Sequence, residues 1–196
     1  MKQKKTVLVV IIVVVIIVLL GILEKKTKRA PASWVFDSPL AKLGFEKVGV
    51  SRLHKAVLQD DRRTLSKLLK EGADPNVQSI DGTTPLHMAA VFGKTECMQI
   101  LMANGADIEA RSLAGDTPLT LAATCAQPAA LELLLSNGAD PNAKGKGGLT
   151  AMECIKKCEY NMTHSNVEWH PGIKMYLRNL KACRALLKEY APTEAK

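Results

Sequence analysis

Apolar residues form two patterns along the chain: one unbroken run near its start, and an arrangement that repeats every 33 residues. The run covers residues 6–23 and contains no charged side chain. In the repeating part, a leucine and the string Gly-Ala-Asp each recur three times at that interval, at Leu53, Leu86 and Leu119 and at Gly72, Gly105 and Gly138. A fixed interval of this size predicts stacked helical units, each of which needs its neighbours to bury its apolar face.

The second unit shows why each repeat should contain two helices. Thr84 is a good N-cap residue, and Pro85 suits the first position of a helix because its φ is already set. Gly93 can supply the tight turn into a second helix. Apolar residues then recur at helical spacing, at Met98, Leu101 and Met102.

The string Asp-Gly-Thr-Thr-Pro-Leu-His-Met-Ala-Ala at residues 81–90, followed by Gly93 and by Asn-Gly-Ala-Asp at 104–107, resembles the ankyrin-repeat family. The resemblance implies an all-α solenoid of helix-turn-helix-loop units. It also implies that His54 and His87 are structural residues that hydrogen-bond across the loop between repeats. We expect about four units, at residues 48–80, 81–113, 114–147 and 148–192.

The first and last units depart from the motif. Ser51 and Arg52 replace Thr-Pro in the first unit, which is typical of a terminal repeat whose outer face meets water. In the last unit, the leucine pair Leu186-Leu187 comes 19 residues late. We therefore predict a polar insertion at about residues 157–171, followed by a longer closing helix.

The apolar run at residues 6–23 is long enough to span a bilayer. Basic residues lie on both sides, in residues 1–5 and in a juxtamembrane segment and linker at 24–47. A cleaved signal peptide is the alternative, because Ala30-Pro31-Ala32 imitates a cleavage site. The run is longer than the usual ~7–15 residues, so we predict a single-pass signal anchor.

The net charge of +8 does not indicate nucleic-acid binding. Residues 1–29 hold seven basic residues and one acidic residue, so they contribute +6 and leave +2 for the other 167 residues. The positive charge thus lies where it can meet anionic lipid head groups. Basic residues are nearly balanced across the run; we expect the repeats on the periplasmic side, with the cytoplasmic side as the alternative.

Five cysteines occur without the spacing of a disulfide framework, at Cys97, Cys125, Cys154, Cys158 and Cys183. We expect buried free thiols, although Cys183 could pair with Cys154 or Cys158 in an oxidising compartment. Cys154, Cys158, His164 and His170 could also form a zinc- or redox-dependent site, but their spacing is not that of a known zinc finger. We predict no metal and no cofactor.

Enzyme motifs are missing from the sequence, which has no phosphate-binding glycine loop and no G-x-S-x-G or H-E-x-x-H string. We therefore expect a non-catalytic protein that binds no nucleic acid and no small-molecule substrate. The partner is expected to be another protein, and residues 6–23 are expected to contact the membrane.

Ankyrin repeats usually bind partners through loop tips and the exposed side of their first helices, which line the concave face. By resemblance, the partner-binding residues are apolar and polar positions of the second and third units, with Trp169 of the insertion as a further candidate. They are Ile80, Asp81, Thr83, Val91, Phe92, Arg111, Leu113, Asp116, Thr124, Lys146 and Trp169. Phe92 could instead pack on the next repeat. The sequence leaves open a scaffold that holds a partner at the membrane and a dedicated inhibitor, such as an immunity protein that neutralises a toxin or hydrolase.

Overall fold

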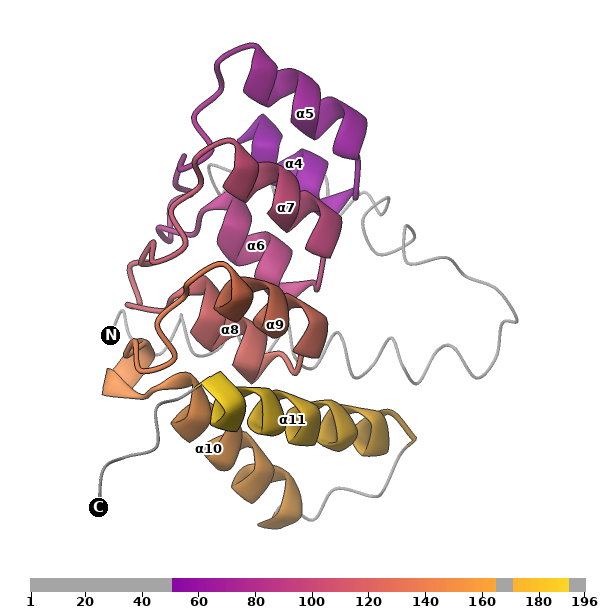
Figure 1. The fold of residues 1–196 in the computed structure, drawn as a ribbon, viewed down its shortest axis with the longest axis vertical. Helices are drawn as coiled ribbons and strands as arrows, with labels where there is room; N and C mark the ends of the chain where they lie inside the picture. Colours follow the sequence, from indigo (N-terminus) through magenta and orange to yellow (C-terminus); the bar gives the residue numbers. More distant parts are fainter. Residues whose placement is uncertain (1–50, 165–170, 191–196) are drawn as a thin grey trace. The chain divides into compact units, whose positions relative to one another are not determined.

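The computed structural model describes residues 51–164 and 171–190, all of which belong to one compact unit of the chain. The described residues form four pairs of helices stacked on one another (Figure 1). The pairs are α4 (Arg52–Leu58) with α5 (Arg62–Lys70), α6 (Pro85–Val91) with α7 (Thr95–Ala103), α8 (Pro118–Thr124) with α9 (Pro128–Ser136), and α10 (Ala151–His164) with α11 (Pro171–Tyr190). The predicted all-α architecture is confirmed for this part of the chain.

Reciprocal capping begins each of the first helices. The Thr84 hydroxyl accepts a hydrogen bond from the backbone N–H of His87, while the His87 side chain accepts one from the Thr84 N–H. Ser51 and Thr117 form the same box at α4 and α8, and Thr150 with Glu153 forms one at α10. The predicted roles of Thr84 and Pro85 are therefore confirmed, and Ser51 performs the capping role in the divergent first unit.

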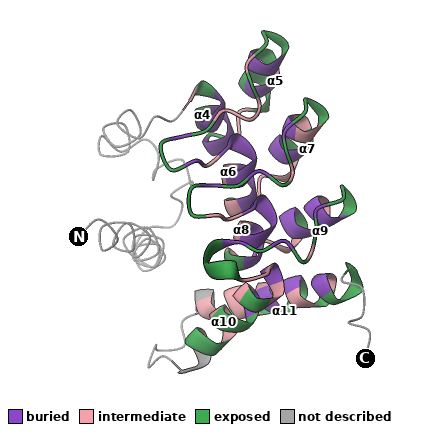
Figure 2. Cartoon of the chain, turned by 90° about the vertical axis from the view of Figure 1, so that its left-hand side faces the viewer, coloured by how far each residue is buried: buried purple, intermediate pink, exposed green. Residues whose placement is uncertain are grey.

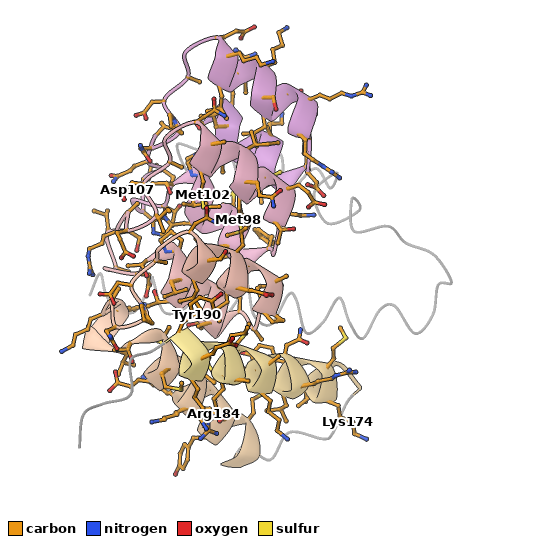
Figure 3. The ribbon with its side chains drawn as sticks, in the orientation of Figure 1. Met98, Met102, Asp107, Lys174, Arg184 and Tyr190 are labelled. Carbon is orange, nitrogen blue, oxygen red and sulfur yellow. The ribbon has the colours of Figure 1, made fainter. Side chains whose placement is uncertain are left out.

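The core lies between successive pairs, where one leucine per unit is almost fully buried (Figure 2). Leu53, Leu86 and Leu119 expose 3%, 0% and 1% of their surface. Alanines such as Ala89 and Ala122 are fully buried beside them, and their small size lets the first helices approach closely. Met98 is buried on α7 while Met102, one turn later, is half-buried, as Figure 3 labels them.

The turn between the two helices of a pair requires a residue with positive φ. Asp60, Gly93 and Ala126 occupy this position in the first three pairs, with φ of 53°, 64° and 54°. Gly93 is needed for a second reason, since a Cβ there would lie 2.5 Å from the Gln127 side chain. The Gln127 amide donates to the carbonyl of Val91 at 3.2 Å, so this close approach ties one pair to the next.

The fourth pair differs from the others because its helices are longer, with 14 residues in α10 and 20 in α11. Residues 157–164, which the sequence predicted to belong to a polar insertion, continue α10 instead. Glu159 stands at the turn position of the earlier pairs, one interval after Ala126. As a helix-forming residue unsuited to positive φ, it lets the helix continue.

The predicted N-terminal span, residues 6–23, lies outside the described residues. Among the helices that are described, none combines the length and apolar character needed to cross a membrane.

Candidate functional site

Two large apolar side chains project from the tips of successive loops. Ile80 exposes 64% of its surface and Leu113 exposes 79%, and they occupy the same position of neighbouring units. Lys146 takes this position in the next loop and is also exposed. The loops form one green ridge along the stack in Figure 2. Exposed leucine and isoleucine side chains set side by side are typical of a surface that another protein covers.

Hydrogen bonds hold the backbone of these tips in place. Leu113 donates its backbone N–H to the carbonyl of Asp81 at 2.9 Å, and a Cβ on Gly82 would lie 2.6 Å from that same nitrogen. Glycine is thus required where one loop tip lies against the next. The apolar tips are therefore presented by a braced ridge whose loops support one another.

Asp81 and Thr83, two predicted partner-binding residues, bond to each other within the loop. The Asp81 carboxylate accepts hydrogen bonds from the Thr83 hydroxyl at 2.7 Å, from the Thr83 N–H at 3.2 Å and from the Ser79 hydroxyl. Burial alone would raise the pKa of Asp81, but these hydrogen bonds outweigh it and the pKa is lowered. The carboxylate stays charged and shapes the loop.

Arg111, Asp116 and Lys146 also connect loops. Arg111 donates through Nη1 to the carbonyl of Lys144 at 2.6 Å, and the Asp116 carboxylate accepts the backbone N–H of Lys146 at 2.9 Å. The sequence placed these residues at a charged rim. The structure adds that they brace the ridge, a role that no pattern within one repeat indicates.

The exposed side of the first helices continues the surface away from the loops. On α6, Val91 is half-buried and Phe92 exposes 39% of its surface. Met88, which the sequence analysis did not select, is half-buried one turn before Phe92, and Leu121 holds its place on α8. The signal was present, because Met88 and Leu121 lie at the same offset from Pro85 and Pro118.

Thr124 lies where α11 reaches α8. Its hydroxyl donates to the carbonyl of Thr120 at 2.8 Å, and its own carbonyl accepts the Tyr176 hydroxyl at 2.6 Å. The side chain of Thr124 remains exposed. Trp169, the remaining candidate, lies outside the described residues.

His54 and His87 make the predicted hydrogen bonds between repeats. The Nε2–H of His54 donates to the carbonyl of Thr83 at 2.9 Å, and that of His87 donates to the carbonyl of Asp116 at 3.0 Å. In both rings Nδ1 faces the backbone N–H of the cap residue, Ser51 or Thr84, and accepts from it. Both histidines are fully buried, so their structural role is confirmed.

Acid should destabilise the repeats through these two histidines. Burial holds the pKa of His54 and of His87 below the ordinary value of 6.5, and a proton on Nδ1 would face a backbone N–H donor. The unfolded chain therefore binds protons first. We expect the free energy of unfolding to be highest above pH 6.5 and to fall as the pH is lowered toward the pKa of the folded state.

The measurement is urea unfolding at pH 7.5 and at pH 5.5 for the wild type and for His87→Thr. Threonine is the matched replacement because Thr120 fills this position in the next unit and completes the same capping box. We expect His87→Thr to lose less stability between the two pH values. An unchanged pH dependence in His87→Thr and in the corresponding His54→Thr would refute the assignment.

The cysteine side chains are free thiols, and several are buried. Burial raises the pKa of Cys125 and of Cys183 to about 11 and also raises the pKa of Cys154. These thiols stay protonated at neutral pH, which opposes both nucleophilic attack and metal binding. In residues 51–164 and 171–190, no three His, Cys, Asp or Glu side chains are placed to hold a metal. The His164 side chain and His170 lie outside the described part, so the predicted zinc alternative is not tested there.

Comparison with known families identifies the repeats. Residues 53–145 match the family model described as ankyrin repeats, in 3 copies. The match covers α4 to α9 and ends before the fourth pair. No curated protein matches the chain. The resemblance drawn from the motif at residues 81–90 is therefore confirmed for this segment.

Proposed function

From the ankyrin repeats of residues 53–145, we propose that this protein is a non-catalytic, membrane-anchored module that binds another protein. Ankyrin repeats are protein–protein interaction modules, and the finer proposal concerns the binding surface, the anchor and the compartment. The observation that carries it is the pair of apolar loop tips, Ile80 and Leu113, on a hydrogen-bonded ridge. A braced ridge loses little conformational entropy on binding, which favours affinity.

We propose that the apolar tips meet apolar side chains of the partner and that Asp81, Asp116, Arg111 and Lys146 surround the contact. Apolar centres with polar rims are the usual anatomy of protein interfaces. Affinity distinguishes the two forms of this function. A dedicated inhibitor is expected to bind at nanomolar Kd or tighter, whereas a scaffold can bind more weakly. A pull-down with residues 30–196 as bait, followed by titration of the captured protein, measures this affinity.

Membrane attachment rests on the apolar run at residues 6–23. We expect the intact protein to stay with membranes after a high-salt wash, because salt screens charge but does not weaken an apolar span. A reporter enzyme active only outside the cytoplasm, fused after Lys196, should be active in a bacterial host. An inactive fusion would place the repeats in the cytoplasm, and release of a shortened soluble form would favour the signal peptide.

A further inference from the structure

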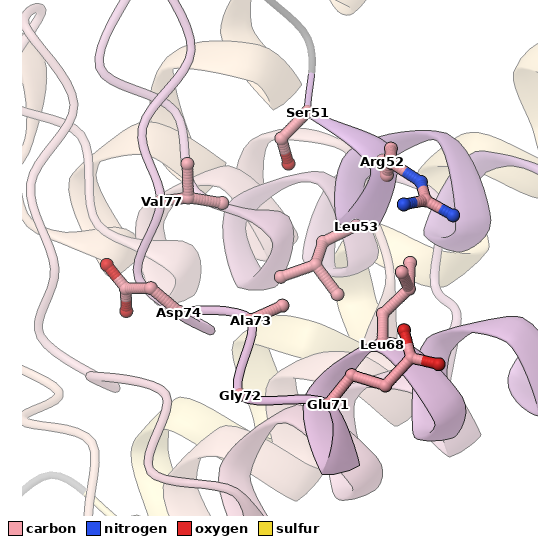
Figure 4. A pocket seen from close by; sticks show the side chains of 9 residues that line it. All are labelled: Ser51, Arg52, Leu53, Leu68, Glu71, Gly72, Ala73, Asp74 and Val77. Atoms are coloured by element: carbon pink, nitrogen blue, oxygen red, sulfur yellow. The ribbon is translucent and has the colours of Figure 1, made fainter.

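The first helical pair leaves a groove at the open end of the stack. The groove has a volume of about 420 Å³ and lies between α4, α5 and the loop that follows them (Figure 4). Leu53 and Leu68 form its apolar floor, Ala73 and Val77 one wall, and Arg52 and Glu71 lie at its edge. This end of α4 has no helical pair stacked on it among the described residues.

The same positions show what covers this surface elsewhere in the stack. Val77 and Ala73 are half-buried, whereas their counterparts Ala110 and Ala106 in the second unit each expose only 8%. Ser51 is likewise half-buried, while its counterpart Thr84 exposes 1%. A preceding helical pair thus completes the burial of each internal unit, and the first unit lacks that cover.

A complete additional repeat does not fit before α4. One 33-residue interval upstream, the counterpart of α4 falls on residues 19–25, which overlap the apolar run at 6–23. The counterpart of α5 falls on residues 29–37, which include a proline at position 31. Proline inside a short helix removes a hydrogen bond and clashes with the preceding turn. Whatever covers the groove is therefore not another ankyrin repeat of this chain.

We propose that residues 34–50 fold over this groove and close the N-terminal end of the stack. The segment contains eight large apolar residues in seventeen, namely Trp34, Val35, Phe36, Leu40, Leu43, Phe45, Val48 and Val50. It leads directly into Ser51, which lines the groove, so closure of the intervening loop costs little entropy. Burial of these side chains against Leu53, Leu68 and Val77 removes apolar surface from water on both sides.

Charge also favours this occupant. Glu71 and Asp74 lie at one side of the groove, and the segment carries Lys42 and Lys47. Arg52 lies at the other side, and the segment carries Glu46. Partly exposed pairs of this kind contribute little energy but disfavour the wrong register.

Docking of residues 34–50 limits the distance between the repeats and the membrane, a consequence that, unlike the docking itself, rests on the proposed anchor. Only residues 24–33 then remain as a linker, and ten extended residues span at most about 36 Å. The groove end of the stack is thereby held near the bilayer.

The first test measures thermal melting of the full chain in detergent micelles. Phe45→Ser removes an apolar residue from the segment, and Val77→Lys places a charge in the groove. We expect each to lower Tm by about 4–8 °C, and the double variant to lower it no further than the stronger single variant. Met175→Lys is the matched control, because Met175 is 66% exposed on α11 and should change Tm by less than about 2 °C.

The second test uses Trp34, which is the only tryptophan left in a Trp169→Phe background. We expect Val77→Lys and Phe45→Ser each to shift Trp34 emission to longer wavelength and to increase its quenching by acrylamide, while far-ultraviolet circular dichroism keeps its helical signal. If Val77→Lys does not fold, Phe45→Ser alone gives the result. Unchanged Trp34 emission, or additive losses of Tm, would overturn the proposal. So would a Tm that rises with protein concentration, since a second copy would then cover the groove.

Discussion

Leu119→Ala is expected to lower the free energy of unfolding by about 2–5 kcal/mol, the usual cost of truncating a fully buried leucine. Leu119 exposes 1% of its surface, and its helix α8 contacts α6 on one side and α10 on the other. Its removal leaves a cavity between two inter-repeat contacts, which carry much of the stability of a stacked array. Small domains have only about 5–15 kcal/mol in total, so much of the stability would be lost.

Urea unfolding of residues 30–196, followed by circular dichroism, measures this loss. Leu113→Ala is the matched control, since it makes the same truncation in the same unit at a side chain that is 79% exposed. Its effect should stay within about 0.5 kcal/mol. Equal effects of the two substitutions would show that the repeat register is wrong.

The parts of the fold that the sequence predicted depend on local rules. The N-cap threonine, the proline after it and the leucine 33 residues from its counterparts each act within one turn or one repeat interval. Local chemistry therefore predicted where the helices begin and which faces are buried. The positive φ of Asp60 and Ala126 was not predicted, because neither is a glycine and the conformation is imposed by packing of the two helices.

Longer-range contacts account for what the sequence did not predict. Glu159 accepts a hydrogen bond from Arg184 at 3.2 Å, so an α11 residue supports the continuation of α10 through the predicted insertion. The bond from Tyr176 to Thr124 joins residues 52 positions apart, and nothing in either local sequence indicates it. For the candidate site, apolar residues at loop tips could be recognised from the register, whereas the cross-loop bonds of Arg111 and Asp116 required coordinates.

The exposed tips provide the sharpest test of the binding surface. The double substitution Ile80→Ser and Leu113→Ser is expected to weaken partner binding by at least about 2 kcal/mol, roughly thirtyfold in Kd, because apolar anchors at the centre of an interface carry much of its energy. Both side chains project into solvent, at 64% and 79% exposure, so the Tm of the variant should match the wild type. Binding and folding would then be separated.

Two further variants locate the edges of the surface. Phe92→Ala tests whether the interface extends past the loops to the end of α6, where Phe92 is 39% exposed. Lys188→Ala is the control, because Lys188 lies exposed on α11 and should change binding by less than about 0.5 kcal/mol. If the double variant binds as tightly as the wild type while Phe92→Ala is weakened, the partner lies along the first helices and the loop tips are not its anchors. If all three variants bind like the wild type, the ridge is not the binding surface.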